Sequence, residues 1–288
     1  MSARAGSTRQ DRIARFRDGV WSHAADTVAT EEPLEIRLEV VAGGVRASQS
    51  LSITMRTPGH DFDLAAGFLF TEGILRSKDD LDEITYCLDS KDGDDDQTYN
   101  VVTVTLRPWV HIDTSRLSRN FYTTSSCGVC GKTSLEAVRG QTPQPPNGDG
   151  LRLPPELLCA LPERLAQGQT LFHTTGGIHA AWLCDAAGAV LAYREDVGRH
   201  NATDKLIGAE FLAGRTPLTD RMLVLSGRAS FELLQKAAVA GIPCVVAVGA
   251  PSTLAVDLAR EMGMTLAGFT KASGFNVYSG AKRIVGAG

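Results

Sequence analysis

The sequence has no long uninterrupted hydrophobic run. Its longest apolar stretch, residues 242–250, is far shorter than the ~20 residues that a transmembrane helix requires. Residues 1–18 contain arginines but no apolar centre of the kind found in secretory signal peptides. We therefore expect neither a membrane span nor an export signal, and we expect the protein to work in the cytoplasm.

Cysteines are few, and their spacing is not that of a disulfide framework. The 288 residues include 6 cysteines, and Cys87, Cys159, Cys184 and Cys244 are each isolated. A chain of this length buries about 75% of its unfolded surface without crosslinks, and disulfide frameworks belong to short secreted chains. Structural zinc would need a second pair of ligands. We expect a reducing compartment and no permanently bound metal.

Positive charge is not in excess either. The chain has 29 lysines and arginines against 33 aspartates and glutamates, for a formal net charge of -4. Nucleic-acid-binding domains are usually basic, so we expect no nucleic-acid partner. The acidic residues 89–97 lack the spacing and the closing glutamate of a calcium loop, which favours a solvated hairpin tip.

Residues 31–115 are predicted to form a small α+β roll. Apolar and polar side chains alternate in residues 35–41 and 51–55, on either side of a glycine pair, as in a β-hairpin with one solvated face. The other predicted elements are a helix capped by Asp61 or Asp63 and strands at 84–88 and 100–106. Residues 1–30 show no such pattern and are expected to form a flexible tail.

Residues 156–288 are predicted to form an α/β domain. A proline-rich stretch precedes them, so residues 116–155 are assigned to a cysteine loop and linker. Continuous apolar strands alternate with single helices, which is typical of a sheet covered on both faces. The predicted elements are helices at 156–165, 201–212 (capped by Asn201), 230–240 and 252–261 (capped by Ser252), and strands at 180–184, 190–193, 222–225, 242–248, 265–269 and 275–278.

The ends of these strands are the expected place for a ligand. In open α/β sheets, ligands lie beyond the carboxyl ends of the strands. Here those ends are residues 226–228, 249–252 and 269–271. The segments contain glycine, serine, arginine and lysine, which suit a phosphate or the edge of a ring.

Charged side chains are dense in residues 194–205. Seven ionisable or imidazole groups fall within these twelve residues, at a strand end and on the first turn of a helix. A helix N-terminus attracts anions, and Arg199 and Lys205 would add positive charge. The alternative is a solvated helix start with ordinary ion pairs.

Cys127 and Cys130 stand in a segment of glycines and small hydroxyl residues, followed by Lys132. Exposed backbone N–H groups and a nearby lysine lower a thiol pKa from about 8.5 toward neutrality. Structural zinc, a thioredoxin-type disulfide and an inert pair are alternatives. The lack of bulky neighbours favours a reactive thiolate on a flexible loop.

Five segments of the chain stand out as motifs. They are Ser-Ser-Cys-Gly-Val-Cys-Gly (125–131), Thr-Gly-Gly-Ile-His-Ala-Ala (175–181), Glu-Asp-Val-Gly-Arg-His-Asn-Ala (195–202), Ser-Gly-Arg-Ala-Ser-Phe-Glu (226–232), and residues 265–269 with 275–278. In register, they resemble the FdhD/NarQ family of formate dehydrogenase accessory sulfurtransferases. The segments follow the family's order. The first 30 residues carry no such similarity.

The resemblance implies a fold and an activity. It implies a cytidine-deaminase-like three-layer α/β domain without zinc, beside the smaller N-terminal α+β roll, and the deaminase His-x-Glu motif is indeed missing. The implied activity is that of a sulfurtransferase that works as a persulfide carrier. Such a protein takes sulfur from a cysteine desulfurase and passes it to the molybdenum of bis(molybdopterin guanine dinucleotide), as formate dehydrogenase requires. The cofactor is a bound substrate, and a homodimer is also implied.

The site residues follow from the same resemblance together with the strand ends. Cys127 is implied to carry the persulfide, with Cys130 as a second catalytic thiol. The expected cofactor-binding residues are Arg199, His200, Ser226, Arg228, Phe269, Thr270, Lys271, Ala272, Ser273 and Gly274. The family often has arginine at the position of Lys271 and again near Gly274, and lysine lacks the planar two-pronged donor.

Two other functions are consistent with the same residues. One is a chaperone that binds and delivers the molybdenum cofactor without sulfur chemistry. The other is a redox-sensing module in which Cys127 and Cys130 form a stable disulfide.

Overall fold

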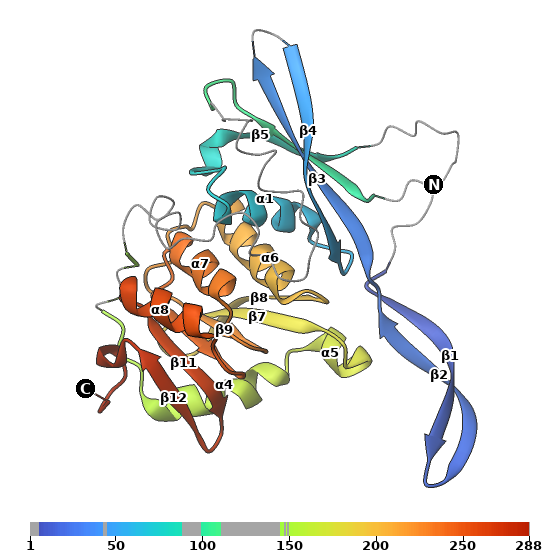
Figure 1. Cartoon of the computed structure of the whole chain (residues 1–288), viewed down its shortest axis with the longest axis vertical. Helices are drawn as coiled ribbons and strands as arrows, with labels where there is room; N and C mark the ends of the chain where they lie inside the picture. The colour runs from blue at the N-terminus through green and yellow to red at the C-terminus, as the bar shows by residue number, and fades with distance from the viewer. Residues whose placement is uncertain are drawn as a thin grey trace.

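The computed structural model describes residues 6–42, 45–87, 99–110, 145–146, 148 and 150–287. Its centre is a six-stranded sheet in the order β12-β11-β10-β9-β7-β8 (Figure 1). The strands are β7 (His179–Cys184), β8 (Val190–Asp196), β9 (Met222–Leu225), β10 (Cys244–Ala247), β11 (Thr265–Lys271) and β12 (Gly274–Ser279). Strands β9, β10 and β11 are parallel, whereas β7, β8 and β12 run antiparallel to their neighbours. The sheet is therefore mixed.

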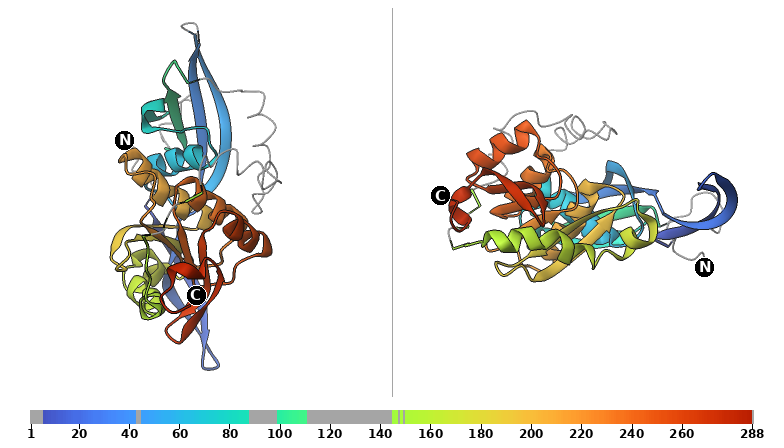
Figure 2. Two further views of the ribbon diagram at one scale, coloured as in Figure 1. Left: turned by 90° about the vertical axis from the view of Figure 1, so that its left-hand side faces the viewer. Right: turned by 90° about the horizontal axis from the view of Figure 1, so that it is seen from below.

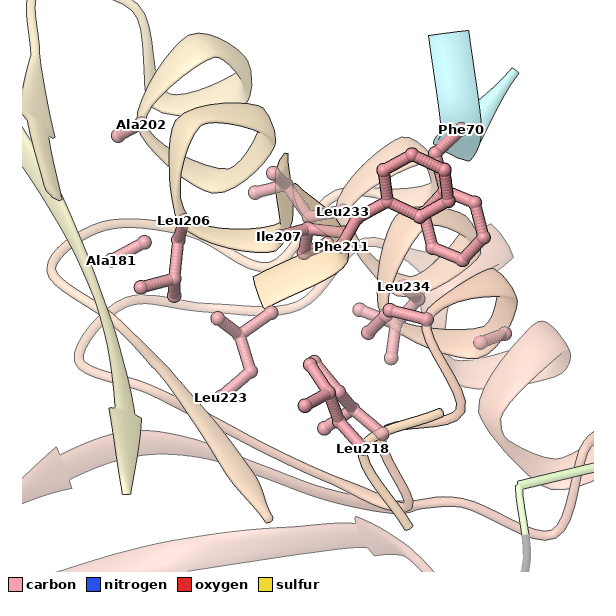
Figure 3. Packing of buried hydrophobic residues seen from close by; sticks show 14 of the residues in the cluster. Phe70, Ala181, Ala202, Leu206, Ile207, Phe211, Leu218, Leu223, Leu233 and Leu234 are labelled. Carbon is pink, nitrogen blue, oxygen red and sulfur yellow. The ribbon is translucent and has the colours of Figure 1, made fainter. Parts of the chain in front are cut away.

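Helices cover both faces of this sheet, as the continuous apolar strands predict. Helix α4 (Pro155–Ala166) lies on one face, and α6 (Arg199–Leu212), α7 (Phe231–Val239) and α8 (Thr253–Glu261) lie on the other. Because successive side chains of a strand point to opposite faces, Met222 and Val224 of β9 pack with α4, while Leu223 and Leu225 pack with α6 and α7 (Figure 3).

A four-stranded sheet in the order β4-β3-β6-β5 forms a further layer. It contains β3 (Glu32–Ala42), β4 (Val45–Arg56), β5 (Leu81–Tyr86) and β6 (Val101–Leu106), with a short 3-10 helix, η1 (Lys78–Asp80), before β5. Helix α1 (Asp61–Thr71) lies between this sheet and α6. The predicted β-β-α-β-β order is confirmed. Leu34, Ile36 and Leu38 belong to the same core cluster as Leu206 and Leu223, so one core runs through both parts.

Two glycines bring the backbones of α1 and α6 into contact. A Cβ added to Gly208 would lie 1.9 Å from the carbonyl oxygen of Asp63, and one added to Gly67 would lie 1.9 Å from that of Asp204. Real Cβ atoms never come so close to backbone atoms, so this helix crossing requires glycine at both positions.

Residues 8–29 form a β-hairpin, in contrast to the flexible tail that we expected for residues 1–30. Strand β1 (Thr8–Arg17) pairs antiparallel with β2 (Val20–Ala29) along its whole length. The hairpin projects from the body in all three views (Figures 1 and 2). Its residues are mostly exposed, which explains why the sequence shows no buried apolar face there.

Two predicted helix caps are wrong and one is confirmed. Helix α6 begins at Arg199 with Gly198 as N-cap, so Asn201 lies inside its first turn. The N-cap of α1 is His60, in a left-handed conformation, while the Asp61 carboxylate accepts hydrogen bonds from Arg56. In both cases a tertiary partner engages the polar side chain. Ser252 does cap α8, accepting a hydrogen bond from the backbone N–H of Ala255.

Two short helices complete the described chain: α5 (Thr170–Thr175), before β7, and the 3-10 helix η2 (Ala281–Arg283), after β12. Over the ranges that the structure describes, no helix is both long and apolar enough to cross a lipid bilayer.

Candidate functional site

Several chain segments meet at one edge of the six-stranded sheet, here called the rim. The rim comprises residues 179, 197–200, 226–228, 248–252 and 269–274, which follow β8, β9, β10 and β11 or begin β7. Backbone hydrogen bonds link neighbouring segments. Gly249 N–H donates to Gly227 O at 3.0 Å, and Phe269 N–H donates to Gly249 O at 3.1 Å. The predicted convergence of these strand ends is therefore confirmed.

Ser226 joins the start of β7 to the end of β9. Its backbone N–H donates to Ala180 O at 3.0 Å, and its hydroxyl oxygen accepts from Ala180 N–H at 2.9 Å. This double contact fixes the turn that carries Gly227 and the exposed side chain of Arg228. Ser226 thus shapes the rim through its backbone contacts.

His179 lies among positively charged groups. Burial lowers its pKa from the usual 6.5, and the charges of Arg199, His200 and Arg228 lower it further. Its ring packs against Gly227, where an added Cβ would lie 3.3 Å from Nδ1. Because of the lowered pKa, His179 is uncharged at neutral pH and offers both a donor and an acceptor nitrogen.

His200 is held by an acidic partner on α7. Its Nε2 lies 2.7 Å from an Oε2 oxygen of Glu232 and 3.3 Å from the hydroxyl of Ser230. The hydrogen bond from His200 is the main reason why the pKa of Glu232 is lowered. The pair orients the imidazole at the N-terminus of α6.

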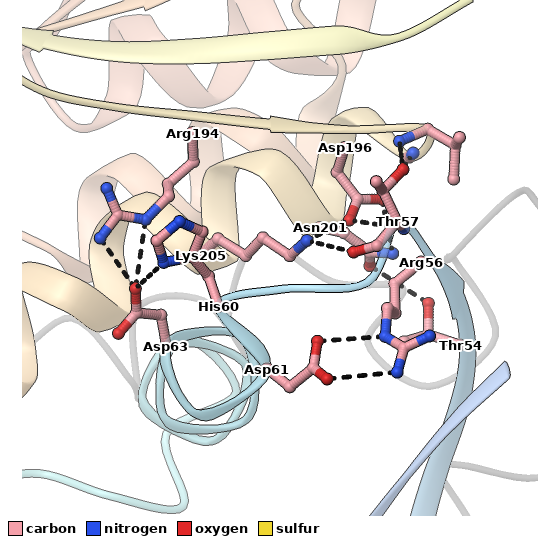
Figure 4. Close-up of polar contacts among 12 residues, drawn as sticks. Thr54, Arg56, Thr57, His60, Asp61, Asp63, Arg194, Asp196, Asn201 and Lys205 are labelled. Atoms are coloured by element: carbon pink, nitrogen blue, oxygen red, sulfur yellow. Dashed lines mark hydrogen bonds and ion pairs between the residues drawn. The ribbon is translucent and has the colours of Figure 1, made fainter. Parts of the chain in front are cut away.

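Asp196 directly precedes the rim segment 197–200 and is held by several buried contacts (Figure 4). Its side chain is fully buried and forms an ion pair with Lys205 Nζ at 2.6 Å. The carboxylate also accepts from the N–H groups of Thr57 at 3.1 Å and Gly198 at 2.8 Å, and from Asn201 Nδ2 at 3.2 Å. Through Asp196, the turn that leads into Arg199 is therefore bonded to Thr57, the residue that follows β4.

Two buried polar atoms at the rim have no partner among the described residues. They are Nε of Arg199 and the hydroxyl oxygen of Thr270, whose residue is 1% exposed. Nearly all buried polar groups in proteins are hydrogen-bonded. Two unpaired groups in the segments predicted to bind a cofactor are what a site for a polar ligand would contain.

The tip between β11 and β12 carries the remaining predicted residues. Phe269 has a left-handed φ of 53° and is 49% exposed, an uncommon conformation for an aromatic residue. The pairing with β12 is irregular between Gly268 and Lys271. Thr270 is buried, whereas Lys271, Ala272 and Ser273 are exposed and Gly274 is half-buried.

Comparison with known proteins gives the family. The sequence profile of the FdhD/NarQ family matches residues 29–285. This chain belongs to that family. It is 51% identical to the sulfur carrier protein FdhD of Streptomyces avermitilis over 282 residues, covering 96% of this chain and 95% of the relative. It is 52% identical to that of Streptomyces coelicolor over 279 residues, with the same coverage.

The fold is shared with a solved structure. The crystal structure of a putative formate dehydrogenase accessory protein from Desulfotalea psychrophila superposes with a TM-score of 0.71. That chain is 22% identical, and the match covers 96% of this chain and 99% of the other. The likeness extends over both sheets and supports the mixed α/β architecture described above.

In this FdhD/NarQ chain, the two predicted catalytic thiols, Cys127 and Cys130, lie outside the described residues. Of the others, Cys184 and Cys244 are buried, and burial raises the pKa of each to about 12. Thiols with such pKa values stay protonated and unreactive. Within the described ranges, no three His, Cys, Asp or Glu side chains are arranged to hold a metal ion.

The sequence alone did not single out His179, Asp196 or Glu232 as parts of the site. His179 and Asp196 face each other across the β7–β8 pair, and Glu232 reaches His200 from another helix. The signal was the position of all three inside the family-like segments. Arg199, His200, Ser226, Arg228 and the stretch 269–274, which were predicted, are brought together at the rim.

Proposed function

We propose that this protein is a sulfur carrier in the maturation of formate dehydrogenase. It takes persulfide sulfur from a cysteine desulfurase onto Cys127 and transfers it to the molybdenum of bis(molybdopterin guanine dinucleotide). The observation that carries the proposal is the identity of about half to relatives named sulfur carrier proteins over nearly the whole chain. The proposed cytidine-deaminase-like fold, cytoplasmic location and homodimer complete this assignment.

The rim supports the cofactor part of the proposal. A guanine dinucleotide is anionic and rich in acceptor atoms, and guanidinium groups are suited to bind phosphate. Arg199 and Arg228 supply such groups from two segments, and Lys271 supplies a point charge from a third. The unpaired Nε of Arg199 and hydroxyl of Thr270 would gain partners from the bound nucleotide.

The sulfur chemistry is thiol–disulfide exchange. The Cys127 thiolate attacks the outer sulfur of the donor's persulfide, the donor's S–S bond breaks, and the donor cysteine leaves as a thiolate. Cys127 now carries the persulfide. A reactive thiolate needs a lowered pKa, which the glycine N–H groups and Lys132 next to it in the sequence can provide.

Cys130 would complete the transfer. Its thiolate attacks the inner sulfur of the Cys127 persulfide and releases hydrosulfide to the metal, which leaves a Cys127–Cys130 disulfide. A cellular dithiol then returns both cysteines to the reduced state.

The decisive experiment is the intact mass of the protein after incubation with a cysteine desulfurase and cysteine. We expect a gain of one sulfur atom, about 32 Da, on wild-type protein and none on Cys127→Ala. The variant should also fail to activate formate dehydrogenase while binding GDP normally. Normal activation by Cys127→Ala would refute the carrier role.

The alternative functions predict other results. A chaperone that delivers the cofactor without sulfur chemistry would bind GDP and activate the client without gaining mass. A redox sensor would form a stable disulfide in air, independently of the desulfurase.

A further inference from the structure

The hairpin of residues 8–29, here called the arm, has two different faces. Directly paired residues in an antiparallel ribbon share a face, so the face of Arg9, Asp11 and Arg15 also carries Asp26. Two ion pairs lie there, Arg9–Asp11 at 3.3 Å and Arg15–Asp26 at 3.9 Å. The same face also carries Arg17 and the apolar residues Ile13, Val20, Ala24 and Val28, and it is the more highly charged of the two faces.

The opposite face has the composition of an interface. It carries Thr8, Gln10, Arg12, Ala14, Phe16, Trp21, His23, Ala25, Thr27 and Ala29. Phe16 and Trp21 are paired directly, with ring centroids 5.1 Å apart. The face contains no lysine and no acidic residue, and it contains two aromatic rings and an arginine. Interface cores are enriched in aromatic residues and arginine and depleted in lysine and acids.

Among the described residues, the body of the same chain leaves the far end of this face uncovered. The contacts at the base are a hydrogen bond from Thr30 N–H to Ser7 O at 2.9 Å and the packing of α5 near β2. Phe16 and Trp21, which are paired next to the turn at the far end, are 56% and 69% exposed. An isolated two-stranded hairpin is marginally stable in water, so cover from a second molecule would stabilise the arm.

We propose that the aromatic face of the arm is an interface between two copies of this chain, each copy laying its arm on the other. A face two strands wide and about 34 Å long covers roughly 350 Å². A stable interface buries about 800 Å² on each partner. One arm on a foreign protein falls well short of this area. In a reciprocal exchange, each copy buries its own arm and also the surface that the other copy's arm covers. The area buried on each copy is then twice that of a single arm.

Charge favours the same occupant. The arm carries four arginines and three aspartates, while the whole chain has a net charge of -4. The body without the arm is therefore net negative, and the arm is net positive. Opposite charges on facing surfaces assist association, and a second copy of this chain supplies the negative surface.

The test is the dimer dissociation constant of the full chain, measured by sedimentation equilibrium. Wild-type protein is compared with the double variant Phe16→Ser, Trp21→Ser. The matched control is Val20→Ser, which replaces an exposed apolar side chain at the same end of the arm but on the opposite face and leaves the charge of the arm unchanged. We expect the aromatic variant to dissociate at least about tenfold more readily, because buried aromatic residues dominate interface energies. The control should stay close to wild type.

The inference rests on the homodimer of the proposed function, and the outcomes separate the two. A monomeric wild type overturns both the dimer and the arm interface. A wild-type dimer that the aromatic substitutions leave unchanged overturns the arm interface alone. The sulfur-carrier assignment is tested separately by the mass gain on Cys127. Because Phe16 and Trp21 are exposed and lie outside both core clusters, the far-UV circular dichroism spectrum of each variant should match that of wild type, which excludes misfolding as the cause.

Discussion

The polar groups at the rim differ from those directly beneath it. Beneath the rim, the Asp196 carboxylate pairs with Lys205 and accepts three further hydrogen bonds. At the rim, Arg199 Nε and the Thr270 hydroxyl have no partner within the described chain. The Asp196 network is fully hydrogen-bonded and holds the backbone in place. Arg199 Nε and the Thr270 hydroxyl have hydrogen-bonding capacity that a bound ligand could satisfy.

One helix connects the two layers. Arg199 is the first residue of α6, and Lys205 lies farther along the same helix. Thr57 accepts hydrogen bonds from both regions: its Oγ1 accepts from the N–H of Val197, and its carbonyl oxygen accepts from Lys205 Nζ. Substitutions in the Asp196–Lys205 network should therefore lower the free energy of unfolding, and substitutions of Arg199 or Thr270 should lower ligand affinity.

The largest effect is expected for Lys205→Ala. The substitution leaves the Asp196 carboxylate charged, buried and without its ion-pair partner. Breaking a buried pair in this way costs about 3–5 kcal/mol. Urea unfolding monitored by circular dichroism measures the loss.

Arg9→Ala is the matched control for that experiment. The side chains of Arg9 and Asp11 are 74% and 53% exposed, and exposed pairs contribute less than about 1 kcal/mol. Equal losses for the two variants would contradict the role of Asp196 as a buried anchor.

A smaller effect, on binding, is expected for Arg199→Ala. A hydrogen bond to a charged group contributes about 1.5–3 kcal/mol, so the affinity for GDP should fall by about tenfold or more. Calorimetric titration measures it. Arg221→Ala, in an exposed pair with Asp220 away from the rim, should bind GDP like wild type. Unchanged affinity of Arg199→Ala would remove this side chain from the site.

The smallest effect is a pH dependence from His179. Because its pKa is lowered in the folded protein, the unfolded chain takes up this proton more readily. The contribution of His179 to stability is complete above the usual pKa of about 6.5 and declines as pH falls toward the lowered value. We expect His179→Gln to flatten the fall in unfolding free energy just below pH 6.5. An identical slope in both proteins would show that His179 is not desolvated.

Local sequence patterns predicted the elements of both sheets because those elements are amphipathic or fully apolar. The alternation at Ile36 and Leu38 and the continuous run through β9 were sufficient. The arm was missed because both of its faces are exposed, so burial imposes no period on β1 and β2.

The candidate site was partly predictable for a related reason. Strand ends identify the rim, since the sheet topology brings them together. Side-chain partners across the fold leave no local signal. Asn201 has the residue type of a helix cap, yet its amide donates to Met55 O at 2.8 Å, more than a hundred positions away in the chain. The role of Glu232 could not be predicted from local sequence for the same reason, because its partner His200 lies on another helix.

The glycine contact between α1 and α6 has a consequence for how the protein comes apart. With Gly67 and Gly208 the two helix backbones touch, and the buried hydrophobic residues of both helices, such as Leu64 and Leu206, belong to one cluster that includes residues of both sheets. Neither half can loosen without exposing the core of the other. Denaturation should therefore be a single cooperative event, and the two halves expressed as separate fragments should remain unfolded until they are mixed.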